Sequence, residues 1–105
     1  MVVLVFVESR VFERYLPNYL SDDEFAGLQL TLRDNPTAGA VIPGSGGIRK
    51  LRWRRQGMGK RGGVRIIYYL HRPNTTWLLT IYAKGEAASI PAHLLRAIRR
   101  EMENG

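Results

Sequence analysis

The 105-residue sequence contains no cysteine, which excludes disulfide bonds, thiolate metal sites and cysteine nucleophiles together. The lack of cysteine also fits a cytoplasmic protein. No hydrophobic run is long enough to span a bilayer, which takes about 20 apolar residues. The apolar opening MVVLVFV has no basic leader and meets charged residues at once. We therefore expect it to form a buried first strand, with no signal or membrane segment.

Acidic residues are missing from the whole middle of the chain. Between Asn35 and Gly85 there is no Asp or Glu, whereas the same interval holds ten Lys and Arg residues. The flanks hold six basic and nine acidic residues, and the chain as a whole carries a formal charge of +7. A positive centre without compensating carboxylates indicates a surface that binds a polyanion, with nucleic acid as the first candidate. A solvated basic face without a ligand is the alternative.

The rest of the composition is that of a globular protein, and the length predicts a single domain over residues 1–105 with one core. Hydrophobic periodicity predicts the order strand, helix, helix, strand, strand, strand, helix. Ser9 is the expected N-cap of the first helix, and Ser21 with Glu24 gives the second a capping box. Strands are expected at residues 2–7, 48–54, 64–71 and 76–84, a second helix to residue 34, a loop at 37–47, and a last helix from Pro91.

Three consecutive strands with short links favour an antiparallel sheet of about four strands. This gives an α/β (α+β) fold in which the helices pack on one face and the other face stays open. Alternation along residues 48–54 puts Lys50, Arg52 and Arg54 on one face. We expect the cations of the middle strands to collect on the open face.

The stretch GMGKRGGV, residues 57–64, has the spacing of glycine-rich loops that cover nucleotide phosphates. The rest of the chain argues against that function. It lacks the HRD and DFG segments of kinases, and a β-branched strand follows where a dinucleotide-binding loop needs a helix. We interpret the glycines as turn residues of a hairpin link whose tip carries Lys60 and Arg61 next to a phosphodiester chain.

Metal and cofactor chemistry find little support in the sequence. A magnesium site would need carboxylates, and the basic middle of the chain has none. The two histidines, His71 and His93, form no recognisable triad. Glu86 is the only acid near the basic region, and we interpret it as a surface charge. We therefore expect neither a metal nor a cofactor.

Four segments together resemble the HigB-type branch of the RelE superfamily, the toxins of bacterial toxin-antitoxin operons. The resemblance covers nearly the whole chain and implies the RelE fold, in agreement with the element order above. It also implies ribosome-dependent cleavage of mRNA and neutralisation by a cognate antitoxin with a helix-turn-helix domain, through which alone operator DNA is contacted. The segments are VESRVFERYLPNYLSDDEF, NPTAGAVIPGSGGIRKLRW, GMGKRGGVRIIYYL and WLLTIYAKGE.

Metal-free RNA cleavage has its own chemical requirements. The ribose 2′-hydroxyl attacks the adjacent phosphate, so the site needs a base, cations for the growing negative charge, and an acid for the leaving oxygen. Arg clamps phosphate through paired hydrogen bonds but does not accept a proton. A Lys among like charges can accept one, because neighbouring cations favour its neutral form, and the candidates are Lys50, Lys60 and Lys84.

The resemblance also implies roles for individual residues. Arg65 in GVRIIYY matches the strand Arg that holds the scissile phosphate, and Lys50 in RKLRW belongs to a basic strand pair with Arg52. Lys84 in IYAKGE lies where family members place further cations. A clear C-terminal catalytic Tyr is absent, so Tyr82 is the substitute candidate for acid or base. The catalytic set is Arg65, Lys84, Lys50 and Tyr82; the RNA- or ribosome-binding set is Arg49, Arg52, Arg54, Arg55, Lys60 and Arg61.

Two other functions fit the same residues. A non-catalytic RNA- or ribosome-binding module would use the same basic face without cleaving RNA. A degenerate family member would serve only as a partner of an antitoxin or an operator.

Overall fold

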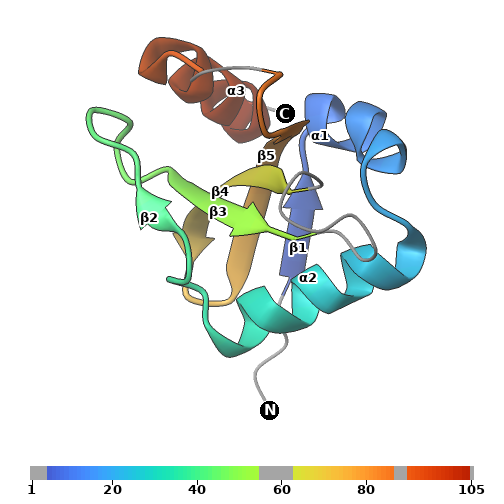
Figure 1. The fold of residues 1–105 in the computed structure, drawn as a ribbon. Coiled ribbons are helices and arrows are strands. Elements are labelled where there is room, and N and C mark those ends of the chain that lie inside the picture. Colours follow the sequence, from blue (N-terminus) through green and yellow to red (C-terminus); the bar gives the residue numbers. More distant parts are fainter. Residues whose placement is uncertain (1–4, 55–62, 87–89, 105) are drawn as a thin grey trace.

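The computed structural model describes residues 5–54, 63–86 and 90–104. Within these residues a single sheet of five strands lies among three α-helices and one 3-10 helix (Figure 1). In chain order the elements are β1 (Val5–Glu8), α1 (Arg10–Tyr15), η1 (Leu16–Asn18), α2 (Asp22–Asp34), β2 (Ala40–Val41), β3 (Arg49–Trp53), β4 (Val64–Arg72), β5 (Thr75–Ala83) and α3 (Ala92–Asn104).

Both early helices begin at the predicted serines. The Ser9 hydroxyl accepts a hydrogen bond from the Phe12 amide at 2.9 Å. Ser21 and Glu24 form the complete, reciprocal capping box. Such caps satisfy amide groups that have no partner inside the helix, so local sequence alone was enough to find them. None of the helices in the described ranges is long and apolar enough to cross a membrane.

The sheet has the strand order β1-β5-β4-β3-β2, with β1 parallel to β5 and the remaining neighbours antiparallel. The predicted fold class and the run of three antiparallel strands are confirmed. The prediction of about four strands was one too few, because residues 40–41, expected in a loop, pair with Arg49 and Lys50. A strand of two residues is too short to show alternation in the sequence.

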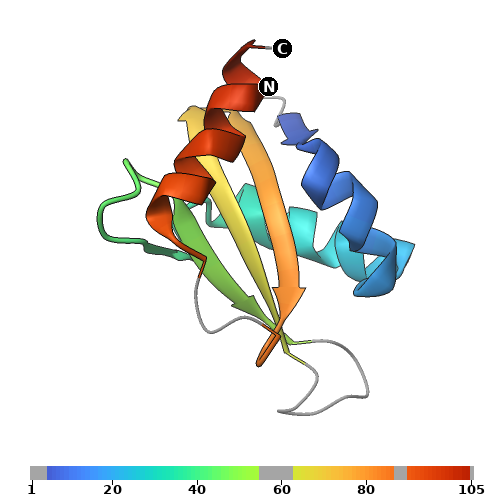
Figure 2. The ribbon, with the colours of Figure 1, turned by 90° about the horizontal axis from the view of Figure 1, so that it is seen from above.

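The helices cover both faces of the sheet, which corrects the prediction that they share one face (Figure 2). α1 and α2 pack on one side through Phe12, Leu28 and Leu32. α3 packs on the other side through the buried Leu95, against Leu79 and its neighbours. The reason lies in β4 and β5, whose middle residues are apolar on both faces. Strands of that kind need a layer of structure on each side.

Two arginines fasten α3 to the loop between β2 and β3. Arg96 donates a hydrogen bond to the Gly44 carbonyl, and Arg99 donates one to the Gly46 carbonyl at 3.1 Å. The Arg99 guanidinium also lies 5.0 Å from the centroid of the Tyr69 ring. These contacts hold α3 over part of its face of the sheet.

The buried Tyr68 anchors the chain that leads into the edge strand β2. Its hydroxyl donates to the Pro36 carbonyl and accepts from the Gly39 amide, each at 2.8 Å. Gly39 has no room for a side chain, since a Cβ there would lie 2.8 Å from a ring carbon of Tyr68 and 2.9 Å from the Lys50 carbonyl oxygen. Burial raises the pKa of Tyr68, so its phenol stays neutral and hydrogen-bonded.

We predict that Tyr68→Phe lowers the free energy of unfolding by about 1–3 kcal/mol, because a buried amide and a partly buried carbonyl lose their partner. Urea unfolding followed by circular dichroism measures the change. Tyr69→Phe is the matched control: it keeps the ring beneath Arg99, and its hydroxyl makes no hydrogen bond within the described residues. The control should stay within about 0.5 kcal/mol of the parent. Equal losses in both variants would show that the Tyr68 hydroxyl is not an anchor.

Candidate functional site

Three of the predicted site residues lie side by side across three strands. Arg65 of β4 is directly opposite Arg52 of β3 on one side and Tyr82 of β5 on the other. Residues that oppose each other in an antiparallel pair share a face, with Cβ atoms about 4.5–5.5 Å apart. Lys50 lies on the same face, opposite Ile67. We refer to Lys50, Arg52, Arg65 and Tyr82 as the Arg65 cluster.

A bulge in β5 places Tyr82 in this row. Leu78 and Thr80 pair with consecutive residues of β4, so Leu79 between them has no partner there. One extra residue reverses the alternation of every side chain beyond it. Accordingly, Ile81 packs in the apolar core beneath α1 and α2, while Tyr82 lies on the α3 side of the sheet together with Leu79. In a strand without the bulge these two side chains would exchange faces.

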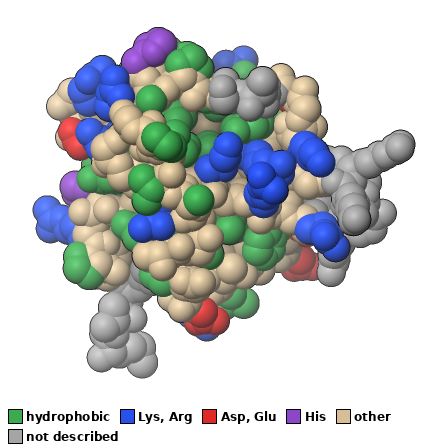
Figure 3. Space-filling view, turned by 60° about the vertical axis from the view of Figure 1, so that its left-hand side comes forward, with side chains coloured by type: hydrophobic (Ala, Val, Ile, Leu, Met, Phe, Trp, Pro, Cys, Tyr) green, Lys and Arg blue, Asp and Glu red, His purple; other side chains and the backbone are tan. Residues whose placement is uncertain are grey.

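The cations of the Arg65 cluster lack an ion-pair partner among the described residues. Arg52 is exposed, and Lys50 and Arg65 are partly buried. The ion pairs found among the described residues involve none of them. Like charges directly opposite each other destabilise a sheet, so an anion bound between Arg52 and Arg65 would offset that repulsion. Figure 3 shows Lys and Arg side chains gathered on one face of the molecule.

Tyr82 differs from its cationic neighbours because its protonated side chain is uncharged. Burial raises the pKa of the Tyr82 phenol, and the charge of Arg65 offsets part of that rise. The phenol is therefore neutral at physiological pH. A neutral phenol next to a guanidinium can donate a proton or a hydrogen bond, which is the role of an acid rather than of a base.

Two further predicted residues lie near the same end of the sheet. Lys84 follows β5 and is exposed, and its backbone amide donates to the Gly63 carbonyl at 3.0 Å. This bond puts Lys84 beside the start of β4, where Arg65 lies. Arg54 is exposed and comes directly after β3. Both can extend the basic surface around the Arg65 cluster.

Arg49 does not join the cluster, although it precedes Lys50 in the same strand. It lies on the opposite face, opposite Tyr68, and its guanidinium donates to the Gly39 carbonyl at 2.7 Å. Arg49 thus belongs to the anchor that holds β2. The other residues predicted to bind RNA or the ribosome lie outside the described residues: Arg55, Lys60 and Arg61.

Glu86 holds the turn after β5. The sequence alone indicated only a surface charge at this position. One oxygen of its carboxylate accepts from the Ala83 amide at 2.8 Å and from the Tyr19 hydroxyl at 2.7 Å. Gly85 in the same turn has a φ of 93°, a conformation that side chains disfavour. Together these residues fix the backbone that carries Lys84. No signal in the sequence linked Tyr19 to this turn, because 67 residues separate it from Glu86.

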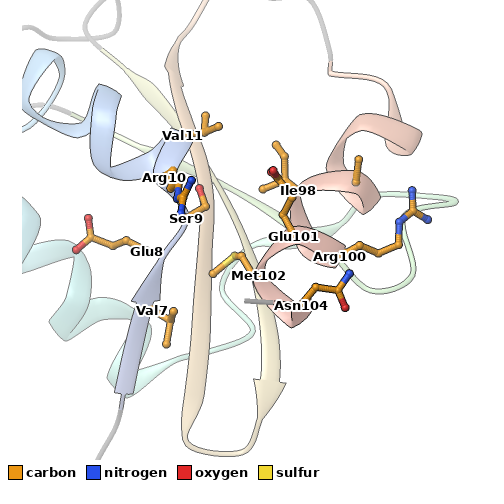
Figure 4. A pocket seen from close by; sticks show the side chains of 11 residues that line it. Val7, Glu8, Ser9, Arg10, Val11, Ile98, Arg100, Glu101, Met102 and Asn104 are labelled. Atoms are coloured by element: carbon orange, nitrogen blue, oxygen red, sulfur yellow. The ribbon is translucent and has the colours of Figure 1, made fainter.

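A groove of about 680 Å³ lies elsewhere, between β1, the start of α1, and α3 (Figure 4). Its walls include Val7, Val11, Ile98 and Met102, and none of the predicted site residues lines it. The groove is therefore distinct from the Arg65 cluster. In the part of the chain that the structure describes, no three His, Asp or Glu side chains lie close enough to hold one metal ion.

The fold has a counterpart among solved structures. No model of a known protein family matches the chain. A double mutant of the E. coli toxin RelE in its free state is similar, with a TM-score of 0.56 over 92% of this chain and 97% of that one. The chain has a RelE-like fold. The sequences are 15% identical, so the similarity concerns the fold, and the HigB-type branch stays a prediction.

We predict that oxidation crosslinks the variant Arg65→Cys/Tyr82→Cys. Because the chain has no native cysteine, any disulfide reports the register, and directly opposite residues lie within disulfide range. Mass spectrometry without reductant detects the bond. Arg65→Cys/Ile81→Cys is the control: Ile81 would oppose Arg65 only in a strand without the bulge, and it faces the other side here. Crosslinking of the control instead of the first pair would contradict the register.

Proposed function

We propose that the chain is the toxin of a toxin-antitoxin pair and a ribosome-dependent mRNA endonuclease that works without a metal. The observation that carries the proposal is the row of Arg52, Arg65 and Tyr82. Two guanidinium groups that form no ion pair among the described residues oppose each other there, beside a neutral phenol. That row lies on a RelE-like fold. A phosphodiester is the ligand that this combination of groups fits best.

Arg65 and Arg52 hold the scissile phosphate in the proposed reaction. A guanidinium presents parallel N–H groups that match two phosphate oxygens. Negative charge on those oxygens grows as the 2′-hydroxyl attacks, so fixed cations stabilise the transition state more than the bound substrate. The partial burial of Arg65 strengthens the effect, because fewer water molecules screen its charge.

Two proton transfers complete the reaction. A base takes the 2′ proton as the new oxygen–phosphorus bond forms, and an acid protonates the 5′-oxygen as its bond to phosphorus breaks. The products are a 2′,3′-cyclic phosphate and a 5′-hydroxyl end. Tyr82 is the proposed acid, since its raised pKa keeps the phenol protonated. Lys50 on the same face and Lys84 after β5 are the candidates for the base.

The proposed partners follow from the same function. mRNA and the ribosome are polyanions that the basic surface would meet through Arg54 and Lys84, together with the predicted Arg55, Lys60 and Arg61. A cognate antitoxin with a helix-turn-helix domain would neutralise the toxin and link it to operator DNA. A neighbouring gene that encodes a small helix-turn-helix protein would support this pairing.

We predict that induction of the chain in bacteria arrests growth and fragments mRNA, and that Arg65→Ala abolishes both effects. Loss of the guanidinium should lower the cleavage rate about 100-fold or more, because it removes a fixed charge from the transition state. Growth curves and mapping of RNA ends measure the two effects. Arg33→Ala is the control, since Arg33 is exposed on α2 and pairs with Asp34. Undiminished toxicity of a folded Arg65→Ala protein would remove Arg65 from the site.

We predict that Tyr82→Phe separates binding from cleavage. Phe keeps the ring but cannot donate a proton, so cleavage should fall about 100-fold while the affinity for ribosomes and RNA stays unchanged.

A non-catalytic binding module would behave differently. It would bind with strong salt dependence, create no new RNA ends, and lose affinity by similar steps with each Lys or Arg substitution. That pattern would replace the endonuclease with the binding module.

A further inference from the structure

Ser9 contacts the bulge of β5 from the point where β1 meets α1 (Figure 4). Its hydroxyl donates to the Leu79 carbonyl at 2.6 Å, and its backbone amide donates to the Leu78 carbonyl at 2.9 Å. In a regular strand, consecutive carbonyls point to opposite neighbours. Here one residue bonds both, at the position where Leu79 has no partner in β4. Ser9 therefore contacts the irregularity itself.

The Ser9 hydroxyl has two functions in the fold. It accepts from the Phe12 amide as the N-cap of α1, and it donates its only proton to Leu79. Only 6% of Ser9 is exposed, so water has little access to replace either bond. A buried carbonyl that loses its hydrogen-bond donor destabilises the fold. Without the Ser9 hydroxyl, the Leu79 carbonyl, which the bulge turns towards β1, would lose its donor.

We propose that Ser9 is a positioning residue, whose hydroxyl stabilises the bulge and thereby keeps Tyr82 opposite Arg65. It acts through the backbone of β5, and within the described residues its hydroxyl bonds to no side chain of the Arg65 cluster. The apolar clusters favour the same register, because a slip would expose Ile81 and turn Tyr82 towards α1 and α2. Loss of the hydroxyl should therefore make local opening of β5 more frequent. Any effect on cleavage rests on the proposed function, whereas the effect on β5 does not.

Hydrogen exchange of the amides of residues 80–83 tests the proposal in the isolated protein. Ser9→Ala should speed their exchange about fivefold or more, because a buried acceptor loses its donor in the native state only. Ser21→Ala is the matched control. Ser21 is also an N-cap serine whose hydroxyl accepts from the third residue of its helix, and its hydroxyl bonds to no strand in the described ranges. The control should stay within about twofold of the parent.

A second variant separates the bulge from the helix cap. Gly caps a helix nearly as well as Ser, so Ser9→Gly weakens the start of α1 little while it removes the donor to Leu79. It should speed exchange as Ser9→Ala does, and it replaces Ser9→Ala in the test if that variant does not fold. Ser9→Thr, which restores a hydroxyl, should restore slow exchange. Exchange at the parent rate in Ser9→Gly, or equal effects of the Ser9 and Ser21 variants, would overturn the proposal.

Two further measurements test whether Ser9 keeps Tyr82 opposite Arg65. In the Arg65→Cys/Tyr82→Cys protein, Ser9→Gly should slow disulfide formation several-fold, and an unchanged rate would overturn the positioning role. In a chain that cleaves RNA, Ser9→Gly should lower kcat with KM unchanged, since Ser9 acts through the backbone of β5 and not on the RNA. Ser9→Thr should restore kcat. A fall in kcat without faster exchange would also overturn the proposal. If the parent cleaves no RNA, the proposed function fails while exchange and crosslinking still decide the role of Ser9.

Discussion

The register between β4 and β5 determines which side chains of this protein meet. Side chains alternate between the faces of a strand, so the unpaired Leu79 exchanges the faces of all residues beyond it. Ile81 thereby enters the core beneath α1 and α2, and Tyr82 comes to lie opposite Arg65. The packing of the core and the composition of the Arg65 cluster thus depend on the same bulge. A substitution that removed the bulge would change both of them.

Burial and charge divide the second face of the sheet between them. α3 covers the apolar part of that face, where Leu79 and Leu95 pack. Extending α3 over Arg52 and Arg65 would be costly, because their guanidinium groups form no ion pair within the described residues. A buried charge without a partner costs far more than a hydrated one. Apolar side chains on this face are therefore covered by α3, and the charged side chains of the Arg65 cluster are not. The arrangement of apolar and charged residues on this face thus determines both where α3 packs and where the basic surface lies.

Features with local causes could be predicted from the sequence. The starts of α1 and α2 followed from Ser9 and Ser21, and the shared face of Lys50 and Arg52 followed from alternation. The pairing of Arg65 with Tyr82, and the contact of Ser9 with Leu79, could not be predicted because they join residues far apart in the chain. The placement of α3 did leave a signal, since the apolar run of residues 66–70 in β4 is typical of a strand covered on both faces.

Not every positive charge in the net charge of +7 is available to bind a polyanion, because several arginines bond to the protein's own backbone. Arg49, Arg96 and Arg99 direct N–H groups at backbone carbonyls of the chain between α2 and β3. Donors that are engaged in this way hold the fold together and are not free to grip a phosphate. A count of counterions released on binding a polyanion would therefore fall below the count of basic residues. In this protein, the partners of a guanidinium decide its role more than its charge does.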